Sequence, residues 1–213
     1  MTIHRRWLPS AVVCALLLLS SGRAAIAAPV APSDDVQRLL MRVRQTADND
    51  AAPFLVLDKK QARVWVFDAA ARPLGSTAVL LGLAIGDETV VGIGERPLSE
   101  IRMDERTTPA GRFVIEPGRN LRGDDILWID YDAAISMHRV HSVNAGERRL
   151  QRLASPTASD NRISFGCINV PVAFYDRVLS PLFNGARGIA YLLPETRPME
   201  SVFSFATEVA RRP

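Results

Sequence analysis

Short β-rich runs separated by turn-forming residues place the strongest limit on the fold of this chain. The runs 54–57 and 64–67 are joined by the link 58–61, and the turn 72–75 leads into a third run that ends at Ile85. Short strands that follow one another across such turns are typical of antiparallel sheets. The chain is therefore predicted to have a mainly β, antiparallel core.

The same pattern continues toward the C-terminus. The turn 107–113 leads into a strand at 113–115, which Pro117-Gly118 is expected to close. The segment 126–137 supplies at least one more strand, and 188–193 is predicted to be the final one.

A few short helices are expected around this core. Apolar residues at helical spacing, with Ser33 or Asp34 as the cap, predict an N-terminal amphipathic helix over 33–46; they are Val36, Leu39, Leu40 and Val43. Short helices are also predicted at 147–153 and 171–182, and the tail 194–213 has some helical character.

The N-terminal segment has the form of a secretory signal. Arg5 and Arg6 precede the apolar stretch 8–19, and Ala25-Ile26-Ala27 fits the small-residue cleavage rule. The stretch is shorter than the roughly 20 residues that a membrane span needs. We therefore expect a signal peptide over 1–27, export to the periplasm or cell envelope, and no stable membrane insertion after cleavage. An uncleaved anchor is the alternative.

Charge and length narrow the class of protein further. Cleavage would remove three arginines and no acidic residue, so 26 basic residues would fall to 23, against 23 acidic ones. A neutral mature chain without a basic patch gives no support to nucleic-acid binding. Its length of about 186 residues suits one folded domain.

Cleavage would also remove Cys14 and leave Cys167 as the one thiol of the mature chain. An unpaired thiol in an oxidising compartment needs a reason. The thiolate is the reactive form, and a free cysteine with a pKa of about 8.5 is mostly protonated at neutral pH, so a nucleophilic cysteine needs a base. Cys167 directly follows Gly166 in a loop with polar ends, and it is predicted to be a catalytic nucleophile.

The mature chain offers two histidines as the base, His138 and His141. They stand three positions apart, so in an extended strand they point to opposite faces. His138 shares a strand face with Ser136 and Ala134, whose small side chains leave room for a substrate. His138 is therefore favoured, and His141 stays as the alternative base.

The neighbours of Cys167 have predicted roles of their own. Gly166 lets the backbone turn, so that N–H groups around Gly166 and Cys167 form an oxyanion hole. Ser164 is expected to orient the histidine or a substrate amide, Arg162 to clamp a substrate carboxylate, and Asn169 to brace the loop or bind the peptide. Each of these three side chains has a purely structural alternative as a loop brace.

Metal binding is not expected. A zinc site made of Cys167, His138 and His141 is conceivable, but the spacing of these residues matches no recognised ligand pattern.

These residues also carry a family resemblance. His138, Ser164, Gly166, Cys167, Ile168 and Asn169 resemble the signature of the L,D-transpeptidase catalytic domain, also called the YkuD-type domain. The sequence Thr-Pro-Ala-Gly-Arg-Phe at 108–113 resembles its upstream hallmark, in the expected order. The resemblance covers 53–193 and implies a β-sandwich-like catalytic domain over 53–195. An N-terminal helical segment and linker at 28–52 precede it, and a tail at 196–213 follows.

The sequence departs from the family pattern in three ways. Phe165 stands where the family usually has histidine, and it is placed with the substrate-binding residues. The 29-residue interval from His138 to Cys167 is longer than usual because of the insertion 147–153. Arg139 follows His138 where many relatives have glycine or serine, whereas His141-Ser142 resembles the His-Ser pair of some relatives.

The resemblance implies an enzyme that acts on peptidoglycan stem peptides without a cofactor. Cys167, deprotonated by His138, would form a thioester that an amine of another stem releases as a cross-link. The alternatives are a hydrolase that uses the same acyl-enzyme and a non-catalytic wall-binding module. A papain-like protease fits less well because its cysteine precedes its histidine. The oligomeric state is not predicted.

Overall fold

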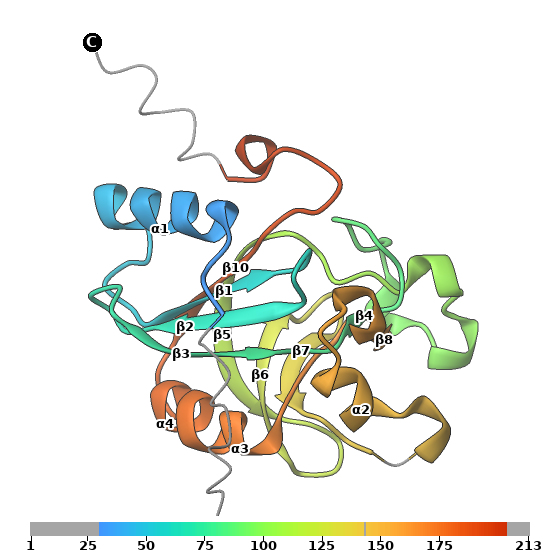
Figure 1. Cartoon of the computed structure of the whole chain (residues 1–213). Helices are drawn as coiled ribbons and strands as arrows, with labels where there is room; N and C mark the ends of the chain where they lie inside the picture. The colour runs from blue at the N-terminus through green and yellow to red at the C-terminus, as the bar shows by residue number, and fades with distance from the viewer. Residues whose placement is uncertain (1–29, 143, 204–213) are drawn as a thin grey trace, which may run out of the picture. The chain divides into compact units, whose positions relative to one another are not determined.

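The computed structural model describes residues 30–142 and 144–203 (Figure 1). The predicted signal peptide 1–27 and the end of the predicted tail, 204–213, lie outside the described residues. The chain divides into a short N-terminal unit, 1–31, and the unit 32–213, which holds every element named below.

The predicted mainly β fold is confirmed. Eight strands form one sheet in the order β3-β2-β1-β10-β5-β6-β7-β9, and β4 pairs with β8 in a second sheet. The strand bounds are β1 Phe54–Asp58, β2 Arg63–Phe67, β3 Pro73–Ala78, β4 Leu81–Gly82, β5 Gly111–Arg119, β6 Asp125–Asp130, β7 Ile135–Arg139, β8 Arg162–Ser164, β9 Ile168–Val170 and β10 Gly188–Leu192.

Strand β5 joins the two halves of the large sheet. Its first half, 111–115, pairs with β10, and its second half, 116–119, pairs with β6. Buried side chains of β1 and β2 share one core with those of β6, β7 and β9. The two halves therefore cover the same core as the layers of a sandwich.

The prediction that Pro117-Gly118 closes this strand was wrong, because β5 continues to Arg119. Proline has no N–H to donate and is tolerated only where a strand edge needs no donor. From Glu116 onward β10 no longer pairs with β5, so one edge of β5 is free of that partner at Pro117.

The sheet is mixed, so the antiparallel prediction was right only in part. The pairs β1–β10, β7–β9 and β4–β8 are parallel. Parallel neighbours need a long crossover connection, and the segment between β7 and β9, which contains α2 and β8, supplies one. This crossover places the predicted base and nucleophile on neighbouring strands.

The predicted N-terminal helix is confirmed as α1, Asp34–Thr46. Ser33 caps it, since the Ser33 hydroxyl accepts a hydrogen bond of 3.3 Å from the Val36 N–H. The apolar face of α1 packs with Phe54 and Tyr191 on the outer side of β1 and β10. Figure 1 shows α1 on one side of the β1–β2 layer and α3 with α4 on the other.

The predicted helix at 171–182 is present as three consecutive helical segments, with Pro171 just before the first. Tyr175, Leu179 and Phe183 point from these turns into the shared core. The predicted helix at 147–153 is also present, and β10 confirms the final strand. The remaining helical bounds are η1 Ile93–Glu95, η2 Leu98–Glu100, η3 Met103–Glu105, η4 Ala145–Glu147, α2 Arg149–Ala154, η5 Ala158–Asn161, α3 Val172–Phe174, η6 (a π-helix) Tyr175–Leu179, α4 Ser180–Phe183 and η7 Met199–Ser201.

None of the helices within 30–142 and 144–203 is long and apolar enough to cross a membrane.

Candidate active site around Cys167

Strands β7 and β9 set the faces on which the candidate catalytic residues lie. They pair in parallel with Met137 opposite Ile168 and His138 opposite Asn169. Met137 and Ile168 point into the core. Because side chains alternate along a strand, Ser136 and His138 lie on the opposite face, together with Asn169 of the neighbouring strand.

Cys167 directly precedes β9, and its side chain lies on this same face. Its Sγ is 3.6 Å from the hydroxyl of Ser136 and 3.5 Å from the carbonyl oxygen of Ala134. The thiol is partly exposed, and it is the free cysteine of the described residues. The candidate nucleophile therefore lies beside the strand that carries His138. In the sequence, Cys167 is two positions before Asn169, the residue that pairs with His138.

The loop before Cys167 is closed by Ser164. The Ser164 hydroxyl donates to the carbonyl oxygen of Cys167 at 2.6 Å and accepts from the N–H of Gly166 at 3.1 Å. Ser164 is almost fully buried. These contacts use Ser164 as a brace of the loop, which is the structural alternative to the predicted contact with histidine or substrate.

Gly166 meets a strict conformational demand in this loop. Its φ of 133° is in the region that favours glycine, and an added Cβ would fall 2.5 Å from Ile135 Cδ1 and 2.7 Å from the carbonyl oxygen of Thr107. The Gly166 N–H is taken by Ser164, whereas the Cys167 N–H has no hydrogen-bond partner within the described part of the chain. Of the two predicted oxyanion donors, the Cys167 N–H is thus the one available.

His138 has a defined proton arrangement. Its Nδ1 lies 2.7 Å from the carbonyl oxygen of Arg139, which can only accept, so Nδ1 carries the proton. The neutral ring then presents Nε2 as its basic nitrogen. Burial lowers the pKa of His138, and the Arg139 carbonyl offsets this in part. A neutral imidazole at neutral pH is what a general base requires.

His141 lies just beyond the end of β7. Its ring stacks on that of His138 with 5.5 Å between centroids, and its Nε2 is 3.8 Å from Asp124 Oδ2. Burial and the neighbouring His138 lower the pKa of His141. His141 lies outside the β7–β9 register that aligns His138 with the thiol strand.

A groove of about 500 Å³ opens on this face. The β5–β6 hairpin, β6, β7 and α2 line it with aromatic, cationic and candidate catalytic side chains, among them Trp128, Tyr131, Arg119, Arg122, Arg149, Ser136, His138 and His141. The rings of Trp128 and Tyr131 pack edge to face, with centroids 5.0 Å apart. The groove thus offers a stacking surface and positive charge on the face that carries His138. Cys167 does not line it, but Ser136, which does, contacts the thiol.

Arg162 is engaged inside the protein. Its guanidinium pairs with Glu195 and donates to the carbonyl oxygen of Lys59 at 3.1 Å. Only 11% of the Arg162 side chain is exposed. These internal acceptors use the donors that a substrate carboxylate would need, so the structure places Arg162 in a structural role.

Asn169 connects the loop to helix α2. Its Nδ2 donates to the carbonyl oxygen of Cys167 at 3.3 Å, and its Oδ1 accepts from Arg149 Nη1 at 2.6 Å. Asn169 is buried, and it braces the loop, one of its two predicted roles. Sequence reasoning missed Arg149, because nothing in the insertion 147–153 marks which side chain returns to the site.

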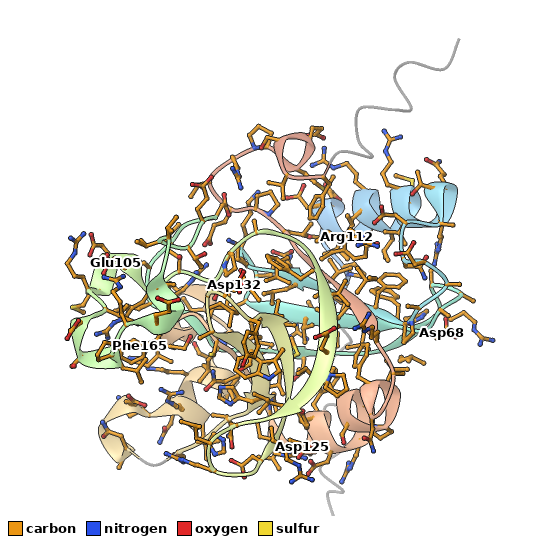
Figure 2. All side chains as sticks on the ribbon, turned by 180° about the vertical axis from the view of Figure 1, so that it is seen from behind. Asp68, Glu105, Arg112, Asp125, Asp132 and Phe165 are labelled. Carbon is orange, nitrogen blue, oxygen red and sulfur yellow. The ribbon has the colours of Figure 1, made fainter. Side chains whose placement is uncertain are left out.

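Phe165 packs against an arginine of the turn that precedes β5. Its ring lies under the guanidinium of Arg106, whose Cζ is 3.9 Å from the ring centroid. In Figure 2 the labelled Phe165 lies close to the segment that carries Glu105. Phe165 does not line the groove next to His138.

Within the described residues, no cluster of three or more histidine, cysteine, aspartate or glutamate side chains is placed to hold a metal ion.

No family model matches the sequence, and no curated protein matches it. Among solved structures, the chain is similar to the NMR structure of the catalytic domain from E. faecium L,D-transpeptidase. That comparison has 16% sequence identity and a TM-score of 0.39, and it covers 67% of this chain and 98% of the other.

Proposed function

We propose that the protein is an exported cysteine-dependent acyl transferase that acts on peptidoglycan stem peptides, an L,D-transpeptidase. The observation that carries the proposal is the shared face of β7 and β9, where the Cys167 thiol contacts Ser136 two residues from His138. The two ordered motifs of the sequence, at 108–113 and 164–169, support the substrate class. The signal-like segment 1–27 supports export.

In the proposed reaction, His138 Nε2 takes the proton of the Cys167 thiol as the sulfur attacks a peptide carbonyl carbon. The Cys167 N–H donates to the oxyanion that forms. The C–N bond then breaks, the leaving amine takes the proton from His138, and a thioester remains on Cys167. An acceptor amine attacks this thioester, and the thiol is regenerated with a new amide bond.

The groove supports an anionic peptide as the acyl donor. Trp128 and Tyr131 offer apolar faces, and Arg119, Arg122 and Arg149 supply positive charge along the same groove. Arginine suits carboxylates because its planar donors match their geometry. Stem peptides combine an extended backbone with free carboxylates and therefore have the matching chemistry.

The test is incubation of the purified protein with defined muropeptides, followed by mass spectrometry of the products. Transfer yields cross-linked dimers, whereas a hydrolase yields trimmed stems without dimers. Cys167→Ser is the control and is expected to give neither product. Trimmed stems alone would replace the transfer proposal with the hydrolase alternative.

A second measurement separates an enzyme from a wall-binding module. The family that the sequence resembles is typically acylated by carbapenems, so the intact protein is expected to gain one drug mass at Cys167. Iodoacetamide serves as a general probe of the same thiol. If neither reagent modifies Cys167, the protein is not a cysteine enzyme.

A further inference from the structure

We propose that Arg149, supplied by the insertion 147–153, is a positioning residue for the nucleophile and holds a positive charge beside His138. This inference rests on the proposed function, because it assigns a role within the same Cys167 site. It also gives the insertion, which lengthens the interval between base and nucleophile, a defined task.

The positioning part rests on a chain of two hydrogen bonds. Arg149 Nη1 donates to Asn169 Oδ1 at 2.6 Å, and Asn169 Nδ2 donates to the carbonyl oxygen of Cys167 at 3.3 Å. Arginine has donors only, so it fixes which end of the Asn169 amide carries oxygen and turns the NH₂ toward Cys167. Arg149 thereby sets the direction of the bond that holds the nucleophile's backbone.

The insertion also orients the arginine itself. Arg149 Nε donates to Glu147, the last residue of η4, and only Arg148 separates η4 from α2. The Arg149 side chain lines the groove and is 16% exposed, and the Glu147 side chain is 31% exposed, so solvent reaches this pair only in part. One nitrogen of Arg149 is thus held by its own insertion and another by β9, which limits the motion of the guanidinium.

The charge part rests on what surrounds His138. Burial lowers the pKa of His138, the carbonyl oxygen of Arg139 raises it, the charge of Arg149 lowers it and that of Asp124 raises it. His141 stacks on the same ring. Arg149 is therefore a cation that opposes protonation of the base, and a protonated base cannot accept the thiol proton.

The experiment measures the rate of Cys167 alkylation by iodoacetamide across pH in the full chain. Arg149→Met is expected to slow alkylation about tenfold at neutral pH, the scale of one lost hydrogen bond to a charged group. In this variant the acid limb of the pH–rate profile, where the alkylation rate falls as the pH decreases, should move to higher pH, because the cation beside His138 is gone. Arg149→Lys keeps the charge and is expected to keep the wild-type acid limb, but with a lower rate because lysine lacks the planar fork.

Arg148→Met is the matched control. Arg148 is the exposed neighbour of Arg149 and has the same charge, and its side chain takes part in no hydrogen bond or ion pair with another described residue. It is expected to behave as the wild type.

An Arg149→Met variant with a wild-type rate and acid limb would overturn the inference. So would a lowered melting temperature with an unmoved acid limb, because Arg149 would then be only structural. If Arg149→Met does not fold, Arg149→Lys decides, and a wild-type rate in it rejects positioning. Carbapenem labelling of the wild type is run in parallel. If the drug does not label the wild type but the acid limb of alkylation still shifts in Arg149→Met, the proposed function is rejected and this inference stands.

Discussion

The Thr108 hydroxyl donates to the carbonyl oxygen of Gly166 at 2.8 Å, so a turn 58 positions upstream holds the loop of the nucleophile. The same hydroxyl accepts from the N–H of Gly82 at 2.9 Å. Thr108 is fully buried, and these two contacts make three distant segments one unit. The two sequence motifs at 108–113 and 164–169 are therefore two sides of a single structural feature.

Thr108→Val keeps the shape of the side chain and removes both contacts. The buried Gly82 N–H and Gly166 carbonyl then lose their partner, which is expected to cost about 1–3 kcal/mol of unfolding free energy. Alkylation of Cys167 should slow as well, since its loop loses an anchor. Urea unfolding measures the stability change.

Thr77→Val on β3 is the control, because Thr77 is half-buried and its hydroxyl has no side-chain hydrogen bond to another described residue. It is expected to change stability by less than about 0.5 kcal/mol. Equal losses of unfolding free energy in the two variants would show that the two Thr108 hydrogen bonds do not stabilise the fold.

Local patterns predicted most of the elements but not how they pair. The β-rich runs 54–57 and 64–67 identified β1 and β2, and helical spacing identified α1, because both signals come from residues close in sequence. The parallel pairing of β7 with β9 depends on where a crossover returns, which no local pattern encodes. The prediction at Pro117 was wrong because the cost of proline in a strand depends on whether a neighbouring strand needs an N–H donor at that position.

The candidate site divides in the same way. Strand alternation correctly placed His138 on one face with Ser136, because the period of two is a local property. The prediction was wrong for Ala134, which lies before β7 with a positive φ of 53°. The partners of Arg162 and Asn169 could not be predicted, since Glu195 and Arg149 reach them only in the folded chain. A charged residue next to a motif can therefore either bind the substrate or stabilise the fold.

Lys59→Met tests the buried ion cluster behind the site. The Lys59 side chain has no exposed area, and its Nζ donates to Asp87 Oδ1 at 2.7 Å and to the carbonyl oxygen of Thr108 at 2.9 Å. Removing one partner of a buried pair leaves the other charge uncompensated, which is expected to cost about 3–5 kcal/mol. Lys60→Met is the control, because Lys60 pairs with Asp35 at the surface and should contribute less than about 1 kcal/mol.

The pH dependence of the same variant has a definite sign. Burial alone would raise the pKa of Asp87, but hydrogen bonds from Lys59 and Thr196 more than offset this and lower it. The stability from Asp87 is thus present above the unfolded pKa of about 3.9 and is lost as the pH falls toward the folded value. Without Lys59 the folded pKa rises, so acid unfolding of Lys59→Met should begin at higher pH than in the wild type. Circular dichroism measures the acid transition, and the same transition pH in Lys59→Met and the wild type would contradict this prediction.

Gly166→Ala is expected to destabilise the nucleophile loop and abolish carbapenem acylation. The added methyl group meets the Thr107 carbonyl, a backbone atom that cannot move aside, and the positive φ adds about 1–3 kcal/mol of strain. Gly185→Ala separates the two effects, since Gly185 has a φ of 79° with open space around its Cβ position. Thermal unfolding should show a larger loss for Gly166→Ala, and equal losses would mean that crowding at the site is unimportant.

His138→Gln and His141→Gln identify the base. His138 lies on the thiol face with Nδ1 held by the Arg139 carbonyl, so its loss is expected to slow carbapenem acylation by about 10²–10⁴-fold, the usual contribution of a general base. His141 lies beyond β7, and His141→Gln should keep acylation within about tenfold of the wild type. The measurement is the initial rate of drug addition, followed by intact-protein mass spectrometry. A larger loss in His141→Gln than in His138→Gln would make His141 the base.

The pH profile of the wild type gives an independent check on the same residue. Burial lowers the pKa of His138, so its imidazole stays neutral below the ordinary value of about 6.5. Since the neutral ring is the active base, the acid limb of acylation should fall below pH 6.5 in the wild type. Burial, the Arg139 carbonyl and the charges of Arg149 and Asp124 set the pKa of His138, so His141→Gln is expected to keep the acid limb of the wild type. An acid limb well above pH 6.5 in the wild type would mean that the group which must be deprotonated is not a buried histidine.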